Sequence, residues 1–290
     1  MACEMPMGSA VFTEEHFFDL ARQDIKDAES LFEKGSLRNG LNFVCRAEEK
    51  TGKGLLCGTG FIQDKKDIRE SKKAIEAYPM DEATRHSLLL ILDAMEKQAP
   101  DDKKELLMKY GHAWHMEFVK MLSLISQPVD DMMVTSDLLA SIGAPSHPVS
   151  AMWHTGDFKL RTENVKSKLG DPAKFRNPPI ADVDLVLDSD NKLLDSASSY
   201  RFSEADSEQI YQRLFKGAPL AQNKVTPQML EKQIGRTFKL TAIADLAVYL
   251  APHYNLSSYL DENTDFEYDE KLSVIHRRMA IIALISRCLG

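Results

Sequence analysis

The chain lacks the sequence features of the common catalytic and membrane classes. It has no GxxxxGK[ST] loop, no GxGxxG turn after a predicted strand and no GxSxG elbow. No apolar run approaches the length of a membrane span, and no apolar segment before Glu14 and Glu15 resembles a secretory signal. These absences predict a soluble, cytoplasmic protein that has no membrane partner.

The chain also has few cysteines and no excess of positive charge. The four cysteines show no CxxC or zinc-ligand spacing, so we expect a reducing setting, no metal and no cofactor. Acidic residues outnumber basic ones by 44 to 36, which gives a net charge of −8 over 290 residues. Such a balance argues against coating nucleic acid through a general basic surface, and it leaves a local basic site open.

Apolar residues recur at three- and four-residue spacing over much of the chain, which predicts an all-α fold. Thr13 is a candidate N-cap for a first helix that stops at Gly35, and Ser36 opens a second that runs to the breakers at Gly58 and Gly60. The tight connection predicts an antiparallel hairpin. Residues 63–73 are strongly charged and are interpreted as a solvated connector, followed by helices at 81–97 and 103–125.

The pattern weakens between residues 128 and 203. A helix at 183–197 is favoured, and a hairpin that turns at 188–191 is the alternative. Helices are then predicted at 203–215, at 226–250 with Pro227 in the first helical position, and at 268–289. The predicted parts are a helical bundle at 13–126, an irregular segment at 127–203 and C-terminal helices at 204–290 that pack on the bundle.

Two helical motifs resemble those of the HEPN (higher eukaryote and prokaryote nucleotide-binding) domain family. The first is an A-x-x-D-x-x-x-A-like pattern and the second a Glu-Lys-x-x-Lys signature, carried by Ala21, Asp24 and Ala28 and by Glu49, Lys50, Lys53, Leu55 and Leu56. A Gly-His segment at Gly111 and His112 is similar to one that opens a later helix of the family. The resemblance covers roughly residues 15 to 125, and the length is similar to that of AbiV-like abortive-infection proteins. It implies a HEPN-like antiparallel bundle with additional C-terminal helices.

Many members of this family are metal-independent ribonucleases with an Arg separated from a His by four to six residues. A histidine supplies acid–base chemistry near neutral pH, and a guanidinium binds the scissile phosphate. No arginine of this chain has a histidine at that spacing. A divergent site would use His112 or His115 with the cation of Lys109 or Arg46. His112 and His115 are also compatible with metal binding, but a packed or hydrogen-bonded pair explains them better.

Two further groups of cations are candidate ligand-binding residues. Arg46, Lys50 and Lys53 could face a phosphate, although ion pairs at helical spacing are the favoured explanation. Arg277 and Arg278 follow His276 and would form a basic pocket if the fold brought them beside Arg46 or Lys109.

The sequence therefore leaves three functions open. The first is a HEPN-like homodimer that binds RNA, a nucleotide or a protein partner in a defence or toxin–antitoxin setting. The second is a divergent ribonuclease. The third is a helical scaffold in which every charged cluster is a solvated face or an ion pair.

Overall fold

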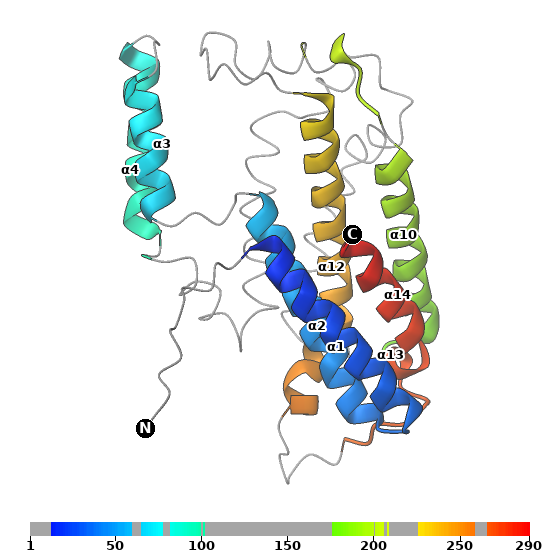
Figure 1. The fold of residues 1–290 in the computed structure, drawn as a ribbon. Helices are drawn as coiled ribbons and strands as arrows, with labels where there is room; N and C mark the ends of the chain where they lie inside the picture. Colours follow the sequence, from blue (N-terminus) through cyan, green and yellow to red (C-terminus); the bar gives the residue numbers. More distant parts are fainter. Residues whose placement is uncertain are drawn as a thin grey trace, which may run out of the picture.

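The computed structural model describes residues 13–59, 65–77, 82–99, 101, 176–199, 201–205, 208, 226–258 and 266–290. Within them all regular secondary structure is α-helical, as predicted (Figure 1). The helices are α1 (Glu14–Glu33), α2 (Leu37–Thr59), α3 (Lys65–Ala77), α4 (Glu82–Gln98), α10 (Ile180–Ser199), α12 (Pro227–Ser258), α13 (Ser273–His276) and α14 (Arg278–Cys288). None of these helices combines the length and apolar character needed to cross a bilayer. The helix predicted at 103–125 and most of that at 203–215 lie outside the described residues.

Helix α1 begins and ends where the sequence predicts. The Thr13 hydroxyl accepts a hydrogen bond from the His16 backbone N–H at 3.2 Å, which satisfies a donor of the first turn. At the other end Gly35 has a φ of 73°, a left-handed conformation that glycine adopts without strain. The backbone N–H of Ser36 donates to the carbonyl of Leu31, which closes a Schellman motif. The chain therefore reverses at once into α2.

Helices α1 and α2 pack closely because two glycines face two phenylalanines. A Cβ atom at Gly40 would lie 2.5 Å from the ring of Phe32, and one at Gly54 would lie 2.6 Å from the ring of Phe18. In each helix the two contact residues are about four turns apart, so both contacts fall on one face. They fix the antiparallel register of the hairpin.

Replacing Gly54 with alanine is expected to lower the free energy of unfolding by about 1–3 kcal/mol. The new Cβ would meet the Phe18 ring and also lie 3.2 Å from the backbone oxygen of Glu14, which has little room to move. Gly235 lies inside α12 with nothing within 4 Å of its Cβ position, so Gly235→Ala is the control and should stabilise by up to about 1 kcal/mol. Urea unfolding followed by circular dichroism measures both. Stabilisation by both substitutions would contradict the close packing.

The interpretation of residues 63–73 as a connector is wrong, because α3 begins at Lys65. Ile68 is buried, and charged side chains of α3 form ion pairs with side chains of α4. Lys65 pairs with Asp101 at 2.7 Å, and Arg69 pairs with Glu96 at 2.6 Å. The partners descend in number as those of α3 ascend, so the two helices are antiparallel. High charge is typical of a solvated loop, but the charged side chains of this segment form ion pairs between two helices.

Helix α10 confirms the favoured interpretation of residues 183–197, and the hairpin alternative is wrong. Residues 188–191 continue the helix, and the Asn191 side chain donates to the carbonyl of Leu187, one turn earlier, at 2.9 Å. Val183, Leu187 and Leu194 are buried on one side. This apolar side faces α12 and is sufficient to hold the segment as a helix.

Helix α12 begins at Pro227 as predicted but continues to Ser258, beyond the predicted end at residue 250. Pro252 lies inside it and is buried. Proline removes one backbone hydrogen bond from a helix, and burial of the flanking apolar face offsets this loss. The helix is thus long enough for Tyr254 to contact Glu49 in the middle of α2 and for Leu256 to contact Arg38 near its start.

The C-terminal helix predicted at 268–289 is shorter than expected and is interrupted. Regular structure starts at Ser273, and Arg277 separates α13 from α14 with a φ of −101° and a ψ of 11°. Arg277 pairs with Asp184, and Arg287 pairs with Asp195. These two pairs keep α14 parallel to α10, as Figure 1 shows.

The C-terminal helices pack on the N-terminal hairpin. Helices α12 and α14 both contact α2, and α10 contacts α12 and α14 (Figure 1). Arg236 of α12 donates to Glu14 of α1 at 3.2 Å, and Arg22 of α1 donates to the carbonyl of Leu289 at 3.3 Å. The hairpin that carries the family-like motifs is therefore bonded to the C-terminal part of the chain at two points in the first half of α1.

Candidate functional site

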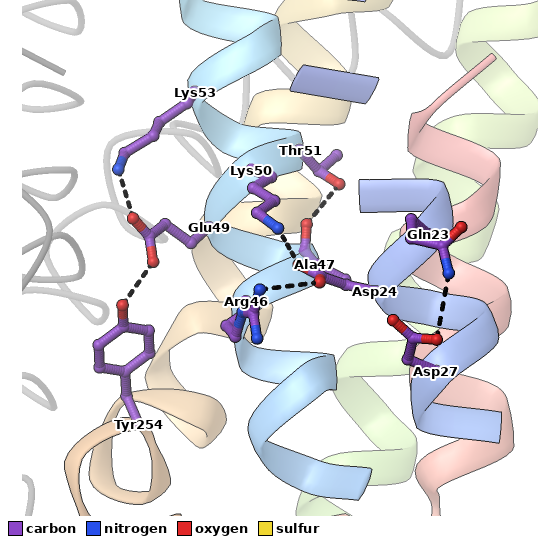
Figure 2. A network of polar contacts seen from close by, with 10 residues as sticks. All are labelled: Gln23, Asp24, Asp27, Arg46, Ala47, Glu49, Lys50, Thr51, Lys53 and Tyr254. Carbon is purple, nitrogen blue, oxygen red and sulfur yellow. Dashed lines mark hydrogen bonds and ion pairs between the residues drawn. The ribbon is translucent and has the colours of Figure 1, made fainter. Parts of the chain in front are cut away.

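The strongest concentration of buried charge lies where α2 meets α1 and α12. We call it the polar network, and it consists of Asp24, Arg46, Glu49, Lys50, Lys53 and Tyr254 (Figure 2). Its cations are the three that the sequence singled out on α2. The partner of each cation decides whether the network is a ligand site or part of the core.

Asp24 holds two of the three cations. Its side chain is only 4% exposed, and it pairs with Arg46 at 3.2 Å and with Lys50 (Figure 2). Asp24 lies among the apolar positions of α1, with Ile25 and Ala28 buried beside it. Burial of a lone carboxylate is strongly unfavourable, so Asp24 needs these cations to be tolerated in the core.

Glu49 holds the third cation. Its carboxylate pairs with Lys53 one turn along α2, and it also accepts a hydrogen bond at 2.6 Å from the Tyr254 hydroxyl of α12. Both charged side chains are about nine-tenths buried. Burial and the adjacent carboxylate raise the pKa of Tyr254, so the phenol keeps its proton and donates. Glu49 thereby ties α2 to α12.

Arg46 is the most accessible cation of the network. Its side chain is 42% exposed, and its guanidinium lies over the Phe43 ring at 4.6 Å from the centroid. Stacking and the Asp24 pair fix it in one orientation. Arg46 can reach solvent, whereas Lys53 cannot.

The thiol beside the network is unreactive. Cys45 is buried, and burial, with a smaller effect of the Glu48 carboxylate, raises the pKa of its thiol. Nucleophilic thiol chemistry needs the thiolate, which this environment disfavours. Cys45 therefore contributes packing and no covalent chemistry.

The candidate cations Arg277 and Arg278 have partners of their own. Arg277 pairs with Asp184, while Arg278 pairs with Glu270 at 2.7 Å and stacks on the Phe32 ring. The structure thus assigns Arg46 and Lys50 to one carboxylate and distributes the remaining candidates over separate partners. His112, His115 and Lys109 lie outside the described residues.

Sequence reasoning missed two members of the network as functional partners. Asp24 was noted only as part of the family-like pattern, although an aspartate on the apolar face of α1 is itself a signal of a buried charge pair. Tyr254 is 205 residues from Glu49 in the chain, and no local pattern indicates their contact.

A second buried polar group lies at the end of α12. His253 is fully buried, with its ring 5.7 Å from that of Phe266 and 6.0 Å from that of Tyr268. Burial is the main cause that lowers the pKa of His253 to about 4. A hydrogen bond to the Arg176 backbone opposes this shift, and the positive charge of Arg176 adds to it. The imidazole is therefore neutral near pH 7.

No described group of three or more His, Cys, Asp or Glu side chains is arranged to hold a metal ion. Comparison with known proteins adds no relative: no family model, curated protein or solved structure matches the chain.

Proposed function

We propose that this chain is a HEPN-like protein that acts by binding rather than by the usual Arg–His ribonuclease chemistry. Its setting would be abortive infection or a toxin–antitoxin system, with a homodimer as the working form and RNA, a nucleotide or a protein as the partner. The observation that supports binding without this chemistry is the pairing of Arg46, Lys50 and Lys53 with Asp24 and Glu49.

These pairs oppose the use of the signature as a phosphate site. A phosphate that approached Lys50 would compete with the Asp24 carboxylate, and displacing that carboxylate would leave it buried without a partner. Lys53 is too deeply buried to meet a ligand without unpacking α2 from α12. The Glu-Lys-x-x-Lys signature in this chain thus stabilises the fold, and a ligand would bind at another surface.

Ribonuclease activity is tested with a mixed pool of structured and single-stranded RNA in EDTA. The wild-type protein is expected to leave the pool intact, because the Arg-to-His spacing is absent and the α2 cations are paired. His112→Ala/His115→Ala is measured beside it, with circular dichroism to confirm that both proteins fold. Cleavage by the wild type that disappears in the double variant would establish the divergent ribonuclease and refute a binding role without catalysis.

Light scattering of the same preparation tests the homodimer. The proposal expects twice the chain mass of 32.7 kDa. A mass equal to that of one chain at micromolar concentration would refute the homodimer. The binding proposal would then depend on the ligand measurements alone.

A further inference from the structure

We propose that the face between α3 and α4 binds the phosphate groups of a nucleotide, either free or within an RNA strand. This inference rests on the proposed binding function and locates its ligand. The site is a cleft of about 460 Å³, which we call the α3–α4 cleft, and its lining consists of Lys65, Arg69, Lys72, Asp93, Glu96 and Lys97. This volume lies within the range of roughly 300–1,000 Å³ that is usual for small-ligand pockets.

The charge of the cleft is opposite to that of the protein. Four cations and two carboxylates line it, whereas the whole chain has a net charge of −8. The lining thus has an excess of two positive charges, one of which the adjacent Asp101 carboxylate offsets, and an excess of one sign attracts counter-ions. The ligand should therefore be an anion with more than one negative charge.

The cations of the cleft differ in how firmly they are held. Lys72 pairs with both Asp93 and Glu96 and is 18% exposed, so it holds α3 and α4 together. Arg69 pairs with Glu96 but is 63% exposed, and Lys65 pairs only with an exposed carboxylate, that of Asp101. Lys97 has no ion pair among the described residues, and its side chain is exposed. The side chains of the other three cations, Arg69, Lys65 and Lys97, can thus reorient toward a ligand. Lys72 meanwhile keeps the two helices together.

Phosphate suits these groups better than a single carboxylate. Arginine presents a planar fork that matches two phosphate oxygens, and lysine acts as a point charge toward a third. Among the residues that the structure describes, the lining has no aromatic ring on which a base could stack. Recognition should therefore depend on the phosphate chain and be insensitive to the base.

The binding test uses the full chain and isothermal titration with ATP, AMP, adenosine and inorganic tripolyphosphate. Tripolyphosphate and ATP should bind with similar affinity, AMP more weakly, and adenosine not at all. A fluorescent single-stranded RNA, measured by anisotropy with and without tripolyphosphate, separates the two sources of phosphate. Competition indicates that RNA uses the cleft, and RNA binding without competition restricts the cleft to free nucleotides. Absence of tripolyphosphate and ATP binding would overturn the inference.

The variant Arg69→Ala/Lys97→Ala locates the site. It is expected to weaken tripolyphosphate binding about tenfold or more and to reduce the dependence of affinity on salt. Lys66→Ala/Lys73→Ala removes the same charge from exposed positions of α3 outside the lining and should change affinity less than about twofold. Arg69→Lys keeps the charge and loses the planar fork, so it should weaken tripolyphosphate binding less than the double variant does. Circular dichroism checks that every variant folds. Equal loss in the two double variants would show general attraction and refute the cleft, whereas RNA cleavage would refute the proposed function instead.

Discussion

Glu49→Ala is expected to lower the free energy of unfolding by about 3–5 kcal/mol, the usual result of removing one partner of a buried ion pair. Lys53 would stay nine-tenths buried with its carboxylate gone, and the Tyr254 hydroxyl would lose its acceptor. Chemical denaturation followed by tryptophan fluorescence and circular dichroism measures the change. Glu33→Ala is the control, because Glu33 is exposed near the end of α1, and its effect should stay within about 0.5 kcal/mol.

The double variant Glu49→Leu/Lys53→Met separates a structural pair from a ligand site. It removes both charges of this buried pair together, so it should recover most of the stability that Glu49→Ala loses. Tyr254→Phe added to it also removes the hydroxyl that donates to Glu49 in the wild type. If Glu49→Ala were as stable as the wild type, the carboxylate would not be needed by the fold, and a structural role for the signature would be refuted.

Lowering the pH from 6.5 to 4 is expected to cost about 3 kcal/mol of stability through His253 alone. The pKa of His253 is about 4 in the folded protein and 6.5 when unfolded, so between these values only the unfolded state binds the proton. The folded state has its full stability above pH 6.5 and loses it as the pH falls toward 4. Burial among Phe266 and Tyr268 is the physical reason.

Denaturant unfolding at pH 7, 6, 5 and 4 measures this effect as a difference from the variant His253→Phe. The phenyl ring suits the aromatic surroundings and cannot be protonated, so the variant should lose less stability than the wild type over this range. His276→Gln, at an exposed histidine, should keep the wild-type slope. Parallel pH profiles for the wild type and His253→Phe would contradict a neutral buried imidazole.

The sequence predicted the helices whose apolar periodicity is clear. Thr13 and Gly35 mark the two ends of α1, because capping and a left-handed backbone are local properties of the sequence. Pro227 marks the start of α12 for the same reason. Helix α3 was missed because its charges pair with α4, a partner that local sequence does not show. The continuation of α12 through Pro252 depends on burial that only the assembled core provides.

The site shows the same division between local and distant contacts. The i,i+4 pair of Glu49 with Lys53 follows from spacing along one helix, and the ion-pair explanation was favoured on that ground. The Asp24 pairs join two helices, and the Tyr254 contact joins segments more than 200 residues apart. Such contacts depend on how helices are placed, which periodicity alone does not specify.

A double-mutant cycle between Asp24 and Lys50 tests most directly whether the signature serves the fold. Asp24→Asn, Lys50→Gln and the double variant are unfolded in urea beside the wild type, and the coupling free energy is obtained from the four stabilities. Contacting charges usually couple by about 0.5–3 kcal/mol, and the burial of Asp24 predicts a favourable value in the upper half of that range. A coupling near zero would contradict the structural role and return Arg46 and Lys50 to the candidate ligand-binding residues.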